Sequence, residues 1–500
     1  MKYRAIPLLL GVLAISLVLA QAINPGIRLR VTDKALQYVD SIAVQLLNEK
    51  VKTATIPDIK GDAHTAIGHI SYSLSSVHFN SLSIPSSTFK TVAGIGLQLQ
   101  ISDASASLSG NWHYRKDHWP HISDSGSFDL DVNGLTVTLK TKLGVDSTGH
   151  PTIAAAGCSS SIGSVKIHFH GGASWLYNLF DKYVDGKIKG TLQDKLCQET
   201  SDLINTNAEK SLSTFPVKKK IDKFAVINYS LVSSPNFTES YADVFIKGEF
   251  LSAITPKEAP FSPTPLPPES ESDKMAYIWL TDYVVNTAGL VYQEAGILNK
   301  TVTPSTLPPN FSYPLNTKTF RLIIPKLYNV YPNRPMNLKV HSTQRPTVSS
   351  SSAGVGLKIN GNVDVYVQLE NGSFVYTFTM GANISTLVKI AVKGNNVTGQ
   401  VDSIKINVHL VNSSIGDISI DVKLLQIALD VFADTIILKQ LNEIGEKGFP
   451  LPVVDGVQLV NPEVTRGQNF NLVATDFKYA PTKKAGLRGS EEAKNNIVVF

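Results

Sequence analysis

The sequence predicts an α+β protein built as two similar domains in a row, and three observations support this fold class. Short apolar segments with period-two alternation recur along the chain between Gly, Ser, Asn and Asp turns, which is typical of antiparallel strands. Each half also contains long segments whose apolar residues follow helical spacing. A run of prolines separates the halves and interrupts both kinds of element.

The strand-like segments are spread over both halves. Their apolar side chains alternate with polar ones, so one face of each strand would be buried. There are too many of these segments for a single sheet. The clearest are Gly96 to Ser102, Ser127 to Leu143, Ser164 to Phe169, Ala242 to Phe250, Asn362 to Leu369 and Ile404 to Val411.

Helical spacing predicts two helices in each half. The first runs from Thr32, a candidate N-cap, to about Ala54, and the second from Ser174 to about Leu212. At 1.5 Å per residue the second helix would be about 60 Å long, so it needs an equally long partner surface. The second half repeats the scheme with helices at about Thr287 to Lys300 and Ile420 to Gly445.

Between the halves, prolines 256, 260, 263, 265, 267 and 268 predict a stiff, extended linker. We therefore expect five regions along the chain. They are a signal peptide at 1–22, an N-terminal domain at 23–250, the linker at 251–273, a C-terminal domain at 274–479 and a disordered tail at 480–500.

Three features favour the secretory pathway. Lys2 and Arg4 precede a short apolar run that ends in a small-x-small cleavage pattern, which is typical of a signal peptide. The chain has two cysteines, Cys158 and Cys197, which we expect to pair in an oxidising compartment. Glycosylation sequons stand at Asn236, Asn299, Asn310, Asn371, Asn383, Asn396 and Asn412, and a further one at Asn228 lies in a strand-like segment and is the least suited to modification.

Charge and motifs exclude several function classes. The net charge of +5 favours anionic partners only weakly, and no basic run suits nucleic acid. After the signal, no segment is long and apolar enough to span a bilayer. No nucleophile elbow, zinc-protease helix or phosphate loop appears, which predicts a protein that is not an enzyme. His168 and His170 share a strand face but lack a third ligand nearby in the sequence, so we predict no metal site.

A set of motifs occurs in order from about residue 23 to 479. They are Ile23 to Ile27 before the first helix, Ile56 to Asp58, Ile84 to Ser87, Cys158 to Ile162 with Cys197 downstream, Leu280 to Tyr283, Asn286 to Gly296 and Lys447 to Pro452. Through these motifs and their order, the chain resembles the family of bactericidal/permeability-increasing and lipopolysaccharide-binding proteins.

This resemblance implies two elongated barrels of twisted antiparallel sheet, each around a long helix and joined by a central sheet. It also implies a disulfide between Cys158 and Cys197, and two apolar pockets that hold phospholipid tails, with no other cofactor. The function it implies is that of a secreted, monomeric innate-defence protein. Such a protein binds lipopolysaccharide and phospholipid at the bacterial outer-membrane surface and acts against Gram-negative bacteria. The alternative is a lipid-transfer protein without microbial recognition.

In this family the lipopolysaccharide-binding cations cluster in loops at the tip of the N-terminal barrel. Here the corresponding segments are Ile59 to Ser71 and Gly110 to Asp124. Histidine partly replaces the lysines expected around residues 60 to 70, and the second segment mixes cations with aromatic rings that suit a lipid interface. An ordinary hairpin with a solvated tip is the competing interpretation. The candidate binding residues are Lys60, His64, His69, Trp112, Arg115, Lys116 and Trp119.

Overall fold

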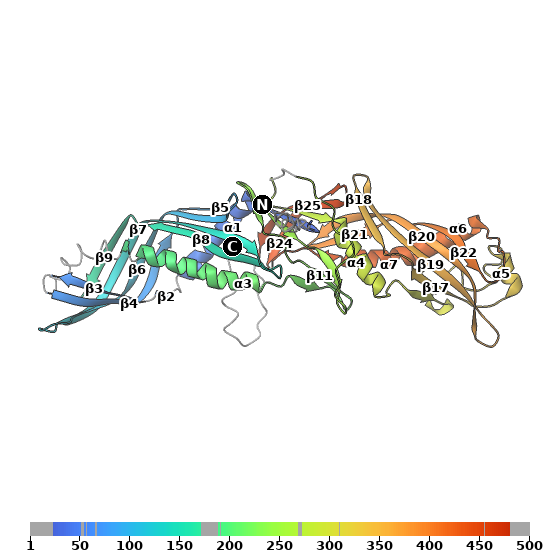
Figure 1. Cartoon of the computed structure of the whole chain (residues 1–500), viewed down its shortest axis with the longest axis horizontal. Helices are drawn as coiled ribbons and strands as arrows, with labels where there is room; N and C mark the ends of the chain where they lie inside the picture. Colours follow the sequence, from blue (N-terminus) through green and yellow to red (C-terminus); the bar gives the residue numbers. More distant parts are fainter. Residues whose placement is uncertain are drawn as a thin grey trace, which may run out of the picture.

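The computed structural model describes residues 24–480 apart from 52–54, 57, 66–67, 172–188, 191, 269–272, 310 and 455. The expected signal peptide, and all of the expected tail except Ala480, lie outside the described residues. The molecule is elongated, with a sheet-rich half at each end and strands of both halves meeting in the middle (Figure 1). None of the described helices is long and apolar enough to cross a membrane.

A central six-stranded sheet joins the halves. Its strand order is β12-β13-β1-β15-β25-β24, so β1 from the first half pairs antiparallel with β15 from the second. All six residues of β15 are buried, which makes this pairing part of the core. The bounds are β1 Ile27–Thr32, β12 Asn236–Phe237, β13 Tyr241–Ile246, β15 Ala276–Thr281, β24 Val457–Gly467 and β25 Phe470–Tyr479. Beside it lies a three-stranded sheet of β10 Lys218–Lys220, β11 Ala225–Asn228 and β14 Glu249–Ser252.

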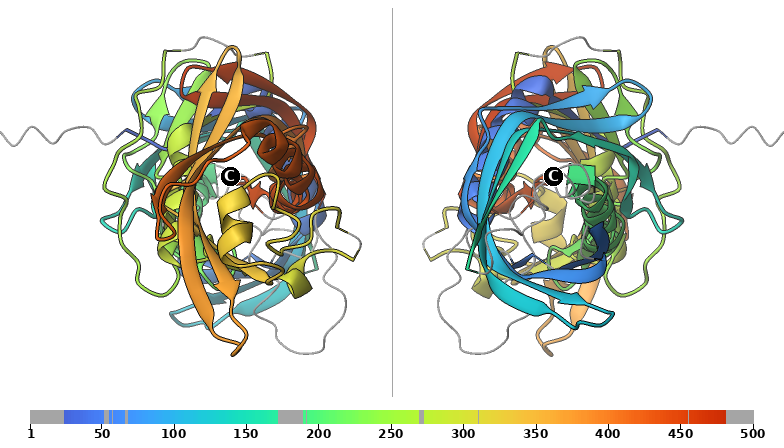
Figure 2. Two further views of the ribbon diagram at one scale, coloured as in Figure 1. Left: turned by 90° about the vertical axis from the view of Figure 1, so that its right-hand side faces the viewer. Right: turned by 90° about the vertical axis from the view of Figure 1, so that its left-hand side faces the viewer.

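The N-terminal half is an eight-stranded sheet that curls into a half-barrel (Figure 2). Its strands are β2 Thr55–Ile56, β3 Ile59–Thr65, β4 Gly68–Ser83, β5 Ser86–Val92, β6 Gly96–Lys116, β7 Ser123–Val145, β8 Pro151–Ser161 and β9 Ser164–His170. Helix α1 spans Asp33–Val51, as predicted. Residues 192–203 are helical and continue through a π-helical turn, η1 Ile204–Ala208, into α3 Glu209–Ser213. Much of the first part of the predicted 174–212 helix lies outside the described residues.

The C-terminal half repeats this arrangement with a second eight-stranded sheet. Its strands are β16 Lys300–Val302, β17 Met336–Ser342, β18 Thr347–Ser351, β19 Gly354–Gln368, β20 Phe374–Lys393, β21 Asn396–Val401, β22 Lys405–Ser413 and β23 Phe449–Pro450. The predicted helix at 420–445 is confirmed as α6 Val422–Phe432 and α7 Leu438–Lys447, joined by the π-helical turn η3 Ala433–Ile437. In the described part of this half, the remaining helices are α4 Asp282–Glu294, the short 3-10 helix η2 Pro304–Thr306 and α5 Pro325–Val330.

Two predicted elements need correction. The helix expected at 287–300 begins earlier, at Asp282 directly after β15, and ends at Glu294, because Gly296 adopts a left-handed φ of 69° that stops the helix. The strand expected at 242–250 is two strands, β13 and β14, which belong to different sheets. Gly248, with φ of 60°, makes the turn between them, and a Cβ there would lie 2.6 Å from Ile27.

Apolar side chains of the sheets and helices form three main clusters, one in each half and one under the central sheet. In the N-terminal half, Trp112, Phe128 and Ile70 point into the concave side, where Leu192 of the helical segment packs against them. The curled antiparallel sheets with their long helices and the joining central sheet confirm the predicted fold class.

Candidate functional site

The far end of the N-terminal half is built from two antiparallel hairpins. β3 pairs with β4 so that His64 lies opposite His69, and β4 pairs with β6 so that Ser71 lies opposite Arg115. Residues 66–67 alone separate β3 from β4, and residues 117–122 alone separate β6 from β7. The two long tip loops expected from the sequence are therefore mostly strand, because period-two alternation continues through both segments.

Trp112 was expected on the exposed tip at a lipid interface, but the structure places it inside the half-barrel. Its side chain is only 4% exposed and packs in the concave core, stacked on Tyr114 and edge-on to Phe169. The indole nitrogen donates to the carbonyl of His170 at 3.3 Å. Alternation along β6 puts positions 112 and 114 on the inner face, so Trp112 stabilises the half-barrel instead of contacting a surface.

The outer face of this end carries polar side chains in three rows across the strands. Register places Lys60, Ser73 and His113 in one row. The next row holds Asp62, Ser71 and Arg115. The last row holds His64 and His69, with Asp117 directly after the end of β6. The hairpin register thus brings together on one face Lys60, His64, His69 and Arg115. Lys116 is paired with Ile70 and therefore lies on the other face of the sheet.

Exposure separates the candidate residues into two groups. Lys60 and His64 are exposed, and the Arg115 side chain is 68% exposed. Trp119, in the loop at 117–122, is 85% exposed, and Ile122 in the same loop is 38% exposed. His69 and Lys116 are half-buried. An aromatic ring and a guanidinium are therefore freely presented to solvent at one end of the molecule.

The Asp117 carboxylate contacts three side chains of the outer face, those of Ser71, His69 and Arg115. Its carboxylate accepts a hydrogen bond from the Ser71 hydroxyl at 2.9 Å and lies 3.0 Å from Nδ1 of His69. The hydrogen bonds from Ser71 and His69 lower the pKa of the Asp117 carboxyl, which is thus ionised at neutral pH. The Arg115 guanidinium lies 3.6 Å from the same carboxylate.

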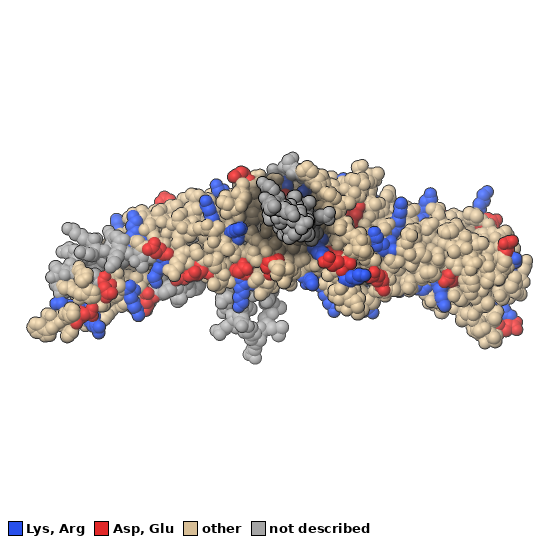
Figure 3. Space-filling view, in the orientation of Figure 1, with Lys and Arg blue, Asp and Glu red and all other residues tan. Residues whose placement is uncertain are grey.

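Acids on the outer face offset its cations. Asp62 and Asp117 stand among Lys60 and Arg115, so the rows contain as many carboxylates as long cations. On the side of the molecule shown in Figure 3, Lys and Arg are interspersed with Asp and Glu and do not form one basic patch. Sequence reasoning missed both acids, although the alternation that places Lys60 and His64 on one face also places Asp62 there.

Two side-chain pairs lie outside the tip, and the first of them was predicted from the sequence. Cys158 on β8 and Cys197 in the helical segment form the predicted disulfide, with their Cα atoms 5.5 Å apart. His170 pairs with Asp129, with Nε2 to Oδ2 at 2.8 Å, on the outer face of β9 and β7. Among the described residues, one group of three can offer metal ligands, and it is Asp62, His69 and Asp117, whose ligand atoms all lie within 4.8 Å of one another.

The sequons differ in accessibility. Asn228 is 8% exposed on β11, which agrees with its being the least suited to glycosylation. Asn310 lies outside the described residues. The other six asparagines are exposed, and glycosylation at them stays a prediction: Asn236, Asn299, Asn371, Asn383, Asn396 and Asn412.

One surface depression lies at the opposite end of the molecule from the tip. It has a volume of about 410 Å³ and is lined in part by Val330, Tyr331, Arg334 and Glu370. The Arg334 and Glu370 side chains form an ion pair across it. A charged lining of this kind does not suit acyl chains, so the two apolar pockets stay a prediction.

Relatives and family models account for nearly the whole chain. It is 34% identical to the bactericidal permeability-increasing protein of Sebastes schlegelii, over 92% of this chain and 96% of that protein. It is 32% identical to the lipopolysaccharide-binding protein of Homo sapiens, over 95% of this chain and 98% of that protein. A crystal structure of lipopolysaccharide binding protein matches with a TM-score of 0.59 and 29% identity, covering 91% of this chain and 100% of that one.

Family models match both halves. Residues 35–207 match the N-terminal domain of the LBP / BPI / CETP family, and residues 219–479 match its C-terminal domain. Proteins of this family bind lipids and are not enzymes, which confirms the prediction made from the absence of catalytic motifs. With both domain models matched in order and the fold shared with a solved relative, this chain belongs to the LBP / BPI / CETP family.

Proposed function

We propose that this protein is a secreted innate-defence protein that binds the lipid A part of lipopolysaccharide through the tip of its N-terminal half-barrel, and that it acts against Gram-negative bacteria. The observation that carries the proposal is the joint exposure of Arg115, 68%, and Trp119, 85%, at this end of the molecule. Lys60 adds a second exposed cation on the same outer face.

Head-group contacts decide selectivity in such a protein. Burying each methylene of an acyl chain contributes about 0.8 kcal/mol relative to water. The acyl chains of a lipid taken from a membrane are already out of water, so burying them in the protein adds little net free energy. Each cation near an anionic surface adds about 1 kcal/mol, and a guanidinium matches phosphate oxygens in a bidentate geometry. Arg115 therefore suits the phosphates of lipid A, while Trp119 suits the adjacent interface.

Relatives support the choice of ligand. The similar proteins from Sebastes schlegelii and Homo sapiens are named for increasing bacterial permeability and for binding lipopolysaccharide. The Cys158–Cys197 disulfide supports an oxidising, extracellular location. The balance of acids and cations on the outer face argues for moderate affinity that falls as salt rises.

Binding of purified protein to lipopolysaccharide, and separately to neutral phospholipid vesicles, tests the proposal. Replacing Lys60, Arg115 and Lys116 together by Ala should weaken lipopolysaccharide binding by roughly 100-fold at low salt, at about 1 kcal/mol for each cation. Phospholipid uptake should be unchanged. Trp119→Ala should weaken binding to lipopolysaccharide vesicles without changing the salt dependence.

The matched control removes the same charge elsewhere. Lys218, Lys219 and Lys220 are all exposed on β10 in the small sheet beside the central one, and replacing them by Ala should leave lipopolysaccharide affinity within about twofold. If both triple variants lose affinity equally, binding is nonspecific and the proposed tip site is wrong. If the wild-type protein takes up phospholipid but not lipopolysaccharide, the lipid-transfer alternative holds.

A further inference from the structure

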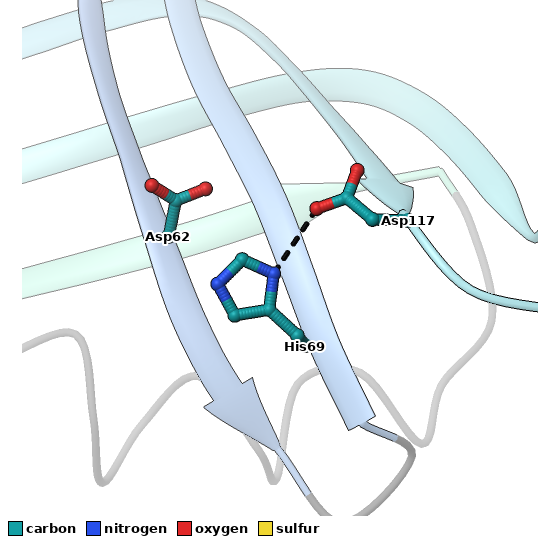
Figure 4. Close-up of side chains that lie close together, drawn as sticks. All are labelled: Asp62, His69 and Asp117. Carbon is teal, nitrogen blue, oxygen red and sulfur yellow. Dashed lines mark hydrogen bonds and ion pairs between the residues drawn. The ribbon is translucent and has the colours of Figure 1, made fainter.

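We propose that Asp62, His69 and Asp117 form a zinc-binding site on the outer face of the N-terminal half-barrel. Their ligand atoms all lie within 4.8 Å of one another, and the imidazole of His69 lies between the two carboxyl groups (Figure 4). The proposal does not depend on the lipid-binding role proposed above, although the cluster adjoins Arg115.

Three separate backbone segments hold the ligands. Asp62 lies on β3, His69 at the start of β4, and Asp117 directly after β6. Hydrogen-bonded ladders join the three strands, with Asp62 opposite Ser71 and Ser71 opposite Arg115. Sheet register therefore fixes the Cα positions of Asp62 and His69, and Asp117 follows directly after the paired residue Lys116.

The donor set favours zinc among the common cations. Zn²⁺ accepts imidazole nitrogen together with carboxylate oxygen, and sites with three protein ligands leave a fourth tetrahedral position for water. Ca²⁺ takes six to eight oxygen ligands and Mg²⁺ needs octahedral oxygen coordination, which one imidazole and two carboxylates do not provide. Two carboxylates also balance the charge of the ion.

To bind a zinc ion, the ligand atoms of Asp62, His69 and Asp117 would have to move slightly closer together. With bonds of about 2.0 to 2.1 Å in a tetrahedron, neighbouring ligand atoms lie about 3.3 Å apart. Nδ1 of His69 and Oδ2 of Asp117 are already 3.0 Å apart. Asp62 is exposed, and its carboxyl group would have to move closer to the other two ligands. Ser71 donates to Asp117 at 2.9 Å and so orients a ligand from outside the coordination sphere, as zinc sites commonly require.

The positive charge of Arg115 would repel a bound zinc ion, and this repulsion can be tested by substitution. Its guanidinium lies 3.6 Å from Asp117, close to the expected position of the cation. Like charges at this separation repel, which lowers the affinity for zinc. Removing the charge with Arg115→Gln should therefore raise zinc affinity several-fold, whereas a merely structural role for the cluster predicts no change.

The experiment is calorimetric titration of ZnCl₂ into the untagged full-length protein after treatment with a chelator and without lipid. We expect one Zn²⁺ per chain. His69→Gln or Asp117→Asn should reduce the affinity by more than about tenfold, and Asp62→Asn should do the same. Cobalt(II) should give the visible absorption of a four-coordinate ion, and His69→Gln should abolish it.

A second His–Asp pair on the same sheet supplies the matched control. His170 and Asp129 lie 2.8 Å apart, and no third ligand joins them among the residues that the structure describes, so Asp129→Asn should leave zinc binding unchanged. Thermal unfolding of each variant without zinc verifies that it is folded. Absence of stoichiometric zinc, binding that survives His69→Gln, or equal competition by Ca²⁺ would each overturn the proposal. Because the titration contains no lipid, failure here leaves the lipopolysaccharide proposal untouched.

Discussion

At the scale of single residues, Arg30 and Asp243 form a charged pair inside the central sheet. The guanidinium makes two hydrogen bonds to the carboxylate, at 2.8 and 2.9 Å, and the side chains are 2% and 8% exposed. Arg30 also lies over the ring of Tyr241 at 3.5 Å. Such a pair contributes little net free energy when intact, but removing one partner is costly because the other charge stays buried.

Asp243→Asn should therefore lower the free energy of unfolding by about 3–5 kcal/mol. Denaturant unfolding followed by tryptophan fluorescence measures the change. The matched control is Asp402→Asn, which breaks the exposed Lys389–Asp402 pair, whose side chains are 69% and 56% exposed. The control should cost less than about 1 kcal/mol. Equal losses in the two variants would contradict the burial argument.

At the scale of elements, an asparagine from a helix forms hydrogen bonds with the backbone of an edge strand in both halves. In the first half, Asn205 of η1 accepts a hydrogen bond from the backbone N–H of Ala155 on β8, at 2.9 Å. In the second half, Asn442 of α7 accepts from the N–H of Val401 on β21 at 2.7 Å and donates to its carbonyl at 2.9 Å. Backbone groups at an open edge invite pairing with other chains, and the helix satisfies them instead.

Asn442→Ala should expose both backbone groups of Val401 and lower the free energy of unfolding by about 1–3 kcal/mol. Hydrogen exchange should then speed up at Val401 more than at strands of the N-terminal half. The matched substitution Asn207→Ala removes an exposed asparagine of η1 and should have little effect. Unchanged exchange at Val401 in Asn442→Ala would show that the helix does not protect this edge.

At the scale of the whole molecule, the two halves are continuous with each other through backbone hydrogen bonds. β1 pairs with β15, and the pairing places Ile27 opposite Leu280. Outside the central sheet, the Tyr229 hydroxyl donates to the carbonyl of Pro450 across the same boundary. Burial raises the pKa of Tyr229, so this donor keeps its proton throughout the ordinary pH range. The elongated shape in Figure 1 therefore belongs to one connected body.

This shape predicts the scattering of the protein in solution. A compact domain of about 480 residues would have a radius of gyration of about 23 Å. We expect small-angle X-ray scattering to give a clearly larger radius at the mass of a monomer. A value near that of a compact sphere would contradict the extended arrangement, and a doubled mass would contradict the monomer.

Features that depend on local sequence could be predicted before the structure was known. Alternation identified the strands, helical spacing identified α1 and the 420–445 segment, and ordered motifs such as Cys158 to Ile162 indicated the family. These features depend on neighbours within one element, so the sequence alone carries them. The family resemblance placed Lys60 and Arg115 at the tip of the N-terminal half, but it led to loops being expected where strands occur, since the alternation was not followed to the end of β6.

Features that depend on register between distant strands became visible only in three dimensions. Trp112 turned inward because β6 continues to Lys116, and Asp62, His69 and Asp117 met because two ladders align β3, β4 and β6. A shift of one residue in either ladder would move these side chains to the opposite face. The sequence therefore set which residues form strands, whereas strand pairing decided which side chains meet.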